Sequence, residues 1–192
     1  MSAFQPGSCS PQPTLAQCAV LQQSFTIPLP AAPPAANQPF TRMQAFYADH
    51  FVLPLPEGHR FPMAKYRLLR DALVHSLPAV KLCEAPAATD GELALAHDPA
   101  YISAVSDGTL EPAAQREIGF PWSPAMAERA RRSVGGTIAA CRAAMHGGGV
   151  AANLAGGTHH AYAHKGGGFC VFNDVAVAAR LMQAEVAREA AR

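Results

Sequence analysis

Charged side chains are scarce in this chain of 192 residues: they make up 15% of it, and the formal net charge at pH 7 is +1. A balance this close to zero gives no broad positive field, which argues against nucleic acid or an anionic membrane surface as a partner. No apolar run approaches the roughly 20 residues that span a bilayer. The chain does not open on a basic stretch followed by an apolar core, so we expect neither a membrane span nor a secretory leader.

None of the five cysteines falls in a spacing that holds a metal ion or a redox-active disulfide. The chain contains no Cys-x-x-Cys pair, which is the pattern typical of zinc sites and thiol redox centres. Cysteines scattered singly are typical of proteins that keep their thiols reduced, as in the cytoplasm. We therefore expect free thiols and a cytoplasmic location.

The first 42 residues have little that could build a core. They hold eight of the 17 prolines, with Gln, Ser and Ala between them, and Arg42 is their one charged residue. Such a composition has neither apolar periodicity nor enough aromatic surface to bury. We predict a disordered Pro/Ala/Gln-rich extension over 1–42, and a single folded region over 43–192, which has the length of one domain.

Within 43–192 the apolar pattern alternates between the strand and the helix period. Short apolar runs predict buried strands at 44–48, 80–84 and 149–155. Apolar residues three and four apart predict helices at 62–77, 123–146 and 174–191, with short helices between 93 and 105 and a loop over 108–122. Strands that alternate with helices favour an α/β fold in which helices cover both faces of a parallel sheet.

The helix predicted over 123–146 has a clear start and a cluster of positive charge. Ser123 followed by Pro124 is typical of an N-cap and a first helical residue. Arg129, Arg131 and Arg132 form a small basic patch one turn further on. We interpret the patch as a solvated face rather than an anion site, because isolated surface charges usually contribute little.

The polar segment from Asn153 to Asp174 contains three of the eight histidines, His159, His160 and His164, between two glycine clusters. It leaves the strand predicted at 149–155 and leads into a helix, the place where open α/β sheets carry their chemistry. Neighbouring side chains of an extended segment point to opposite sides, but a glycine-flanked loop lets both rings face one cavity. A histidine pair suits general acid/base work; a pair of surface loop histidines is the alternative.

Several segments of the chain form recognisable motifs when they are taken together. They are Pro56–Met63, His97–Ile102, Arg132–Ile138, Gly156–Ala161, Gly167–Cys170 and Asn173–Asp174. These motifs resemble those of the zinc-dependent histone deacetylase family, most closely its class IV and bacterial acetoin-utilisation-like branch, and the resemblance covers roughly 44–192 in the family's order.

The resemblance implies a three-layer α/β/α fold of the arginase/deacetylase type and a hydrolase that removes N-acetyl or other N-acyl groups from lysine or a related small amine. His160 matches the family's general base and His159 its assisting histidine. Gly168 and Phe169 match the wall of the acyl-lysine tunnel, and Cys170 matches a cysteine near the catalytic floor. Phe169 as a core aromatic and Cys170 as a small buried hydrophobe are the alternatives.

The family also implies a catalytic Zn²⁺, but its metal ligands have no counterpart here. In the family an Asp-x-His pair and a later aspartate follow the helix that ends this sequence. The adjacent pairs His97-Asp98 and Asp49-His50 lack a third ligand in recognisable spacing, and catalytic zinc usually needs three protein ligands. We assign no metal ligand to this chain and expect a truncated, N-terminal portion of a deacetylase domain.

Two other interpretations remain open at this point. The chain could be a catalytically inactive fragment, or a binding or assembly module that reuses the same half-domain. Because half of a parallel sheet exposes an unpaired edge, we expect residues 43–192 to be marginally stable alone. Whether the chain is an enzyme is left undecided by the sequence.

Overall fold

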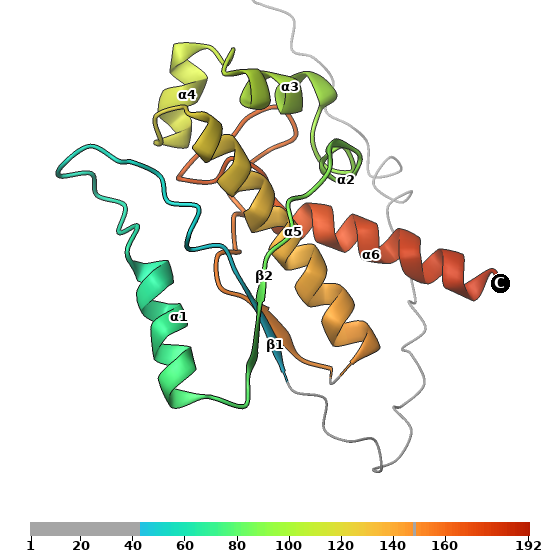
Figure 1. The fold of residues 1–192 in the computed structure, drawn as a ribbon. Coiled ribbons are helices and arrows are strands. Elements are labelled where there is room, and N and C mark those ends of the chain that lie inside the picture. The colour runs from blue at the N-terminus through green and yellow to red at the C-terminus, as the bar shows by residue number, and fades with distance from the viewer. Residues whose placement is uncertain (1–42, 148) are drawn as a thin grey trace, which may run out of the picture. The chain divides into compact units, whose positions relative to one another are not determined.

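Helices separate the strands along the chain in the computed structural model, which describes residues 43–147 and 149–192 (Figure 1). The predictions made for residues 1–42 lie outside the described residues. In chain order the elements are β1 (Gln44–Tyr47), α1 (Lys65–Ser76), β2 (Lys81–Glu84), α2 (Asp90–Leu93), α3 (Pro99–Asp107), α4 (Pro112–Ile118), α5 (Pro124–His146), β3 (Ala151–Asn153) and α6 (Asp174–Ala190).

The strands form a three-stranded parallel sheet in the order β2-β1-β3. Gln44 of the central strand β1 lies opposite Lys81 of β2 and Ala151 of β3. Ala45 and Phe46 of β1 are buried, as expected for the apolar run that predicted this strand. The predicted α/β fold with a parallel sheet is therefore confirmed, and the carboxyl ends of all three strands lie at one edge.

The long helix α5 packs on β1 and β3. It starts as predicted, because the Ser123 hydroxyl accepts a hydrogen bond from the amide of Met126 at 3.1 Å and Pro124 is the first helical residue. Gly135 lets the helix approach the segment that follows β2. A methyl group at this position would overlap the carbonyl oxygen of Pro86 and lie 2.9 Å from the amide nitrogen of Ala88.

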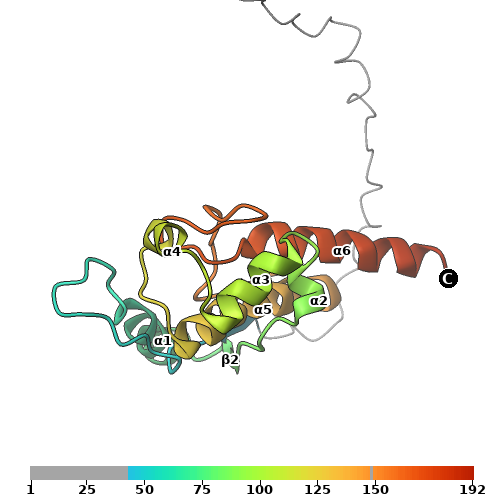
Figure 2. The ribbon, with the colours of Figure 1, turned by 90° about the horizontal axis from the view of Figure 1, so that it is seen from above.

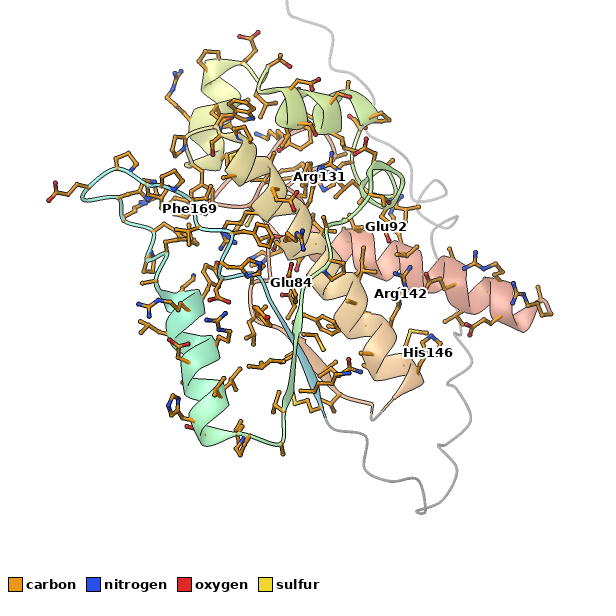
Figure 3. The ribbon with its side chains drawn as sticks, viewed as in Figure 1. Glu84, Glu92, Arg131, Arg142, His146 and Phe169 are labelled. Carbon is orange, nitrogen blue, oxygen red and sulfur yellow. The ribbon has the colours of Figure 1, made fainter. Side chains whose placement is uncertain are left out.

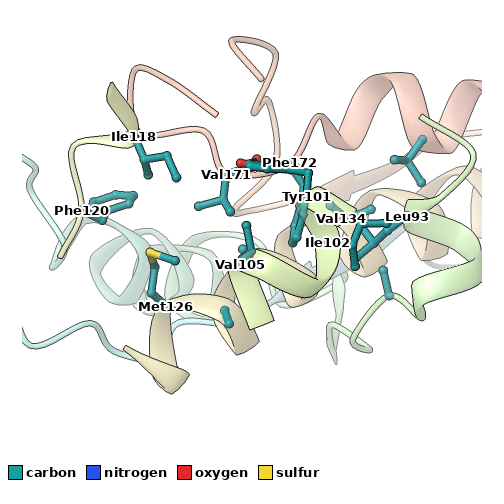
Figure 4. Packing of buried hydrophobic residues seen from close by; sticks show 14 of the residues in the cluster. Leu93, Tyr101, Ile102, Val105, Ile118, Phe120, Met126, Val134, Val171 and Phe172 are labelled. Atoms are coloured by element: carbon teal, nitrogen blue, oxygen red, sulfur yellow. Dashed lines mark hydrogen bonds between the residues drawn. The ribbon is translucent and has the colours of Figure 1, made fainter. Parts of the chain in front are cut away.

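The main apolar core lies where the helices α2 to α6 meet the segment that precedes α6 (Figure 4). Viewed from above, α3 lies beside α5 and α2 lies close to α6 (Figure 2). Fully buried members of this core include Leu93, Val105, Ile118, Val134, Phe172 and Val177. Packing of α6 against α5 therefore fixes the point at which the histidine-containing segment ends.

The stretch 108–122 is not a loop throughout, because it contains the helix α4. Pro112 occupies the first turn of α4, where its missing N–H costs nothing. Gly119 closes the helix in a left-handed conformation with φ of 85°. The prediction of a loop over 108–122 was wrong because the short helix has too few residues to show an apolar period.

Helix α1 lies at the periphery of the described residues, and Figure 1 draws the strands between α1 and the α5–α6 pair. None of its residues is buried, and Leu69 is 44% exposed. The apolar period predicted the helix but could not predict how much of its apolar face would be covered. Within the described ranges, no helix has both the length and the apolar character needed to cross a membrane.

Candidate active site

The histidine-containing segment starts at the carboxyl edge of the sheet. It leaves β3 after Asn153 and ends at Asn173, which caps the N-terminus of α6 by accepting a hydrogen bond from the amide of Ala176 at 3.0 Å. Parallel sheets carry their functional loops at this edge. The location predicted for the segment between 153 and 174 is therefore the one observed.

His159 and His160 lie side by side. Their ring centroids are 4.3 Å apart and the ring planes are inclined by 39°. Both residues are exposed, and the carbonyl oxygen of Gly157 lies 2.9 Å from Nδ1 of His159. The turn between the glycines has brought the two imidazoles to the same side, which an extended segment would not do.

Gly168 and Phe169 form a left-handed step next to the histidine pair, with φ of 55° and 66°. A methyl group on Gly168 would lie 3.4 Å from Cγ of His160, in ordinary contact. Phe169 is the one residue other than glycine in the described ranges with positive φ, a conformation that costs an aromatic residue roughly 1–3 kcal/mol. Strain of this kind persists only where packing holds the residue in place.

That packing comes from an aromatic wall made by His59, Phe61, Phe120 and Phe169. The ring of Phe169 lies 5.1 Å from the rings of Phe61 and Phe120 and 5.8 Å from His59. His59 is held in turn by the carbonyl oxygen of Gly119, 3.0 Å from its Nε2. Figure 3 shows Phe169 beside the segment that leads into α1. A cavity of about 40 Å³ lies against the wall.

Cys170 is buried and points into the loop rather than to solvent. Its Sγ lies 3.6 Å from the carbonyl oxygen of Gly168. Burial raises the pKa of the Cys170 thiol above its usual value, so the reactive thiolate is disfavoured at neutral pH. Cys170 therefore packs as a small buried residue at the base of the loop.

The arginines of α5 do not share one solvated face. Two of them pair with acidic residues of neighbouring elements, Arg131 with Asp90 at 2.6 Å and Arg132 with Glu84 at 2.9 Å. Arg129 turns inward instead and is 7% exposed, with its guanidinium carbon 4.4 Å from the ring centroid of Tyr66. The prediction of a solvated face is wrong for Arg129, because a planar guanidinium can stack on an aromatic ring.

His97 binds the end of the histidine-containing segment through a hydrogen bond, a role that the sequence did not reveal. It is 3% exposed, and its Nε2 accepts a hydrogen bond from the amide of Asn173 at 2.8 Å. Burial lowers the pKa of His97, and the nearby backbone of Ala163 and Tyr162 opposes this effect. His97 is therefore a buried neutral acceptor that holds the residue before α6.

Acidification is expected to destabilise the protein through His97. A buried histidine with a lowered pKa favours the folded state while it is neutral, and this contribution is lost as the pH falls below about 6.5, the unfolded value. His97→Gln keeps an acceptor for Asn173 but does not titrate. Urea unfolding at pH 7.5 and at pH 5.5 gives the free energy of unfolding that is lost on acidification. This loss should be smaller for His97→Gln than for wild type, whereas the exposed-site control His75→Gln should lose as much as wild type. Equal losses in all three would refute this role.

The described residues do not fit a zinc site. No three His, Cys, Asp or Glu side chains within 43–147 and 149–192 come together in a group that could hold a metal ion. The two adjacent pairs noted in the sequence are engaged elsewhere: His97 with Asn173, and Asp49 with Arg70 at 3.1 Å. The zinc ion that the resemblance implies is therefore assigned no ligand here.

The described residues thus form a parallel α/β domain with two adjacent imidazoles and an aromatic wall. The histone deacetylase domain matches residues 59–190. The chain is therefore a member of the histone deacetylase family, as its motifs predicted.

Two individual proteins show sequence similarity to this chain. It is 43% identical over 139 residues to an uncharacterized protein of Picosynechococcus, and 41% identical over 106 residues to the acetoin utilization protein AcuC of Bacillus subtilis. These matches cover 71% and 50% of this chain but 46% and 27% of the relatives, so the chain spans less than half the length of either.

Solved structures give the same fold. A crystal structure of a histone deacetylase homologue complexed with SAHA is 26% identical, with a TM-score of 0.62 over 76% of this chain and 42% of that one. A homologue from Aquifex aeolicus is 25% identical, with a TM-score of 0.60 over the same shares. The predicted deacetylase-like fold is confirmed by these similarities.

Proposed function

We propose that the chain carries the histidine pair of a deacetylase, which hydrolyses an N-acetyl or other N-acyl group on lysine or a related small amine. One observation supports this proposal most: two exposed imidazoles lie 4.3 Å apart with Gly168 against His160 and Phe169 next in sequence. The pair and the wall thus offer a proton acceptor and an apolar surface within one site.

His160 acts as the general base. It takes a proton from the water that attacks the acyl carbonyl carbon, and later gives a proton to the amine nitrogen as the C–N bond breaks. His159 assists with its ring centroid 4.3 Å from that of His160: in its doubly protonated form it donates from Nε2 to the carbonyl oxygen and stabilises the negative charge that develops there. The products are a carboxylic acid and a free amine, and the acid then passes its proton to the amine or to water and leaves as a carboxylate. A proton taken up in the first step and released in the second leaves His160 unchanged after each cycle.

Gly168 and Phe169 hold the substrate beside the pair. The absence of a side chain at Gly168 lets an extended aliphatic stem pass close to the backbone. The ring of Phe169 supplies an apolar face for that stem. Cys170 lies beneath both residues and closes the base of the site. The family implies a zinc ion that polarises the carbonyl, but no step above runs through a metal because the described residues offer no ligand group for one.

Release of acetate from an acetyl-lysine peptide by the purified protein, with zinc ions added, tests the proposal. We expect release above that of a His160→Ala variant purified in the same way. A rate equal to that of the variant would contradict the proposal. If the acetylated peptide then bound without being cleaved, the chain would be a binding module, which is the second interpretation of the sequence.

Phe169→Ala is expected to weaken substrate binding more than it slows the chemical step. The substitution removes the ring that contacts Phe61 and Phe120. The substrate then loses an apolar surface whose burial contributes roughly 1.5–3 kcal/mol to the free energy of binding. We expect KM for an acetyl-lysine peptide to rise about tenfold or more, with a smaller fall in kcat. Tyr162→Ala, at a side chain 64% exposed on the same segment, is the control and should leave both constants unchanged. A fall confined to kcat would contradict a binding role for Phe169.

A further inference from the structure

Asp174, the first residue of α6, is completely buried although it carries a carboxylate. Four hydrogen-bond donors from three residues surround it. Oδ1 accepts from the amide of Thr158 at 2.7 Å and from its hydroxyl at 2.9 Å. Oδ2 accepts from the amide of Gly157 at 2.8 Å and from the hydroxyl of Thr137 at 2.5 Å. Burial of a carboxylate is costly unless such donors satisfy it.

Two of these donors are the backbone amides of the residues just before the histidine pair. Thr158 and Gly157 are therefore fixed by Asp174, sixteen and seventeen positions further along the chain. Gly156 completes the fit, because a methyl group there would lie 2.8 Å from Oδ2 of Asp174. The turn that brings both imidazoles to one side is thus wrapped around a single carboxylate.

One peptide group links the carboxylate directly to an imidazole. The peptide between Gly157 and Thr158 donates its N–H to Oδ1 of Asp174, and its carbonyl oxygen lies 2.9 Å from Nδ1 of His159. A carbonyl oxygen can only accept, so Nδ1 carries the proton and Nε2 is left as the basic nitrogen of the neutral ring. Hydrogen bonds in series polarise one another, and the carboxylate therefore strengthens the bond that orients His159.

The carboxylate is itself anchored to two other elements. The Thr137 hydroxyl of α5, which donates to Asp174, accepts from Nδ2 of Asn153 at 2.8 Å. The same Nδ2 lies 2.7 Å from the carbonyl oxygen of Ser133. The network thus joins α5, the end of β3 and the start of α6. These hydrogen bonds hold the turn in a fixed position relative to the packed helices and the sheet.

We propose that Asp174 is the positioning residue of the histidine pair. It fixes the turn at 156–158 and, through the peptide between Gly157 and Thr158, the tautomer and direction of the His159 ring against which His160 lies. The catalytic consequence of this role rests on the proposed function; the effect on the rings does not. No motif signals this role, because the partners are distant in sequence.

Asp174→Asn tests the proposal in the full chain. The amide replaces one acceptor oxygen with an NH₂ group that faces hydrogen-bond donors. At least one of the hydrogen bonds that hold the turn is therefore lost. We expect the ring ¹⁵N shifts of His159 to move from separate Nδ1 and Nε2 values towards averaged ones. Amide exchange at Gly157 and Thr158 should be about tenfold faster or more. Asp49→Asn, at a carboxylate whose side chain is 4% exposed and paired with Arg70, is the matched control and should leave the rings unchanged.

Activity provides the second readout. For the folded fraction of Asp174→Asn we expect kcat to fall roughly tenfold to a hundredfold, as misplacement of a reacting group commonly does, with KM within about twofold. Should Asp174→Asn fail to fold, Thr137→Val is the second variant, because it removes a single hydroxyl donor. It should move the ring ¹⁵N shifts of His159 in the same direction by a smaller amount.

The outcomes separate the two claims. Unchanged His159 ring shifts in folded Asp174→Asn, or in Thr137→Val if the first variant does not fold, would overturn the positioning role. If the His159 ring shifts change as expected in the variant but the wild-type protein releases no acetate, the positioning role is supported and the deacetylase function is contradicted.

Discussion

Replacing His160 with alanine is expected to lower kcat/KM for an acetyl-lysine peptide by roughly 10²–10⁴-fold, the usual contribution of a positioned general base. His160 is exposed beside Gly168, with its ring centroid 4.3 Å from that of His159, so its loss removes the proposed proton acceptor without opening the core. The folded state should keep its unfolding midpoint. The effect should appear in kcat and kcat/KM alike, because the interaction lost is one made in the transition state.

Two further substitutions make this result specific. His164→Ala, at an exposed position on the same segment, is the matched control and should retain wild-type turnover. His159→Ala should cost less than His160→Ala, and the double variant should cost less than the sum of the two, since residues that act as a unit are not additive. Equal losses for His160→Ala and His164→Ala would mean that the segment, and not its base, is responsible.

Gly135→Ala is expected to destabilise the fold by roughly 3 kcal/mol or more, at or above the upper end of the range for overpacking. A methyl group at Gly135 would overlap the carbonyl oxygen of Pro86 and come within 2.9 Å of the amide of Ala88. Both atoms are backbone, so no side-chain rotation relieves the overlap. The helix α5 would have to move away from the segment after β2, and the Arg131 carbonyl would lose its bond from the Ala88 amide, now 3.0 Å long.

Gly91→Ala is the matched control for this substitution. Gly91 lies in α2, and a methyl group there would meet no atom within 4 Å. Because alanine loses less backbone entropy on folding than glycine, this variant should gain about 0.4–1 kcal/mol. Urea unfolding of both variants measures the difference. A loss below about 1 kcal/mol for Gly135→Ala would show that α5 is not held against the chain at this point.

Local patterns predicted the scaffold because its signals lie close together in the sequence. Apolar runs marked all three strands, and Ser123-Pro124 marked the start of α5 by a capping bond that spans three residues. The helix α4 was missed because its boundaries depend on Pro112 and Gly119 rather than on apolar periodicity. The inward turn of Arg129 was missed because it depends on Tyr66, a residue of another helix.

The site divides in the same way. The family motifs pointed to the histidine pair and to the residues at 168–170, and the structure brings Gly168 against His160. Sequence alone could not say whether the rings share a side, because neighbours in an extended chain diverge. The answer depends on Asp174 and His97, whose contacts with the segment span 16 to 76 positions. Such tertiary hydrogen bonds leave no local pattern.

Titration of isotope-labelled protein with an acetyl-lysine peptide, followed by NMR, tests the central claim most directly because it does not depend on turnover. The account predicts that the peptide shifts the ring signals of His160 and the amide signals of Gly168 and Phe169, with intermolecular contacts between the acetyl methyl group and His160. Signals of Tyr162 and His164 should stay in place. Peptide-induced shifts that spare His160 and Phe169, or no shifts at all, would contradict it.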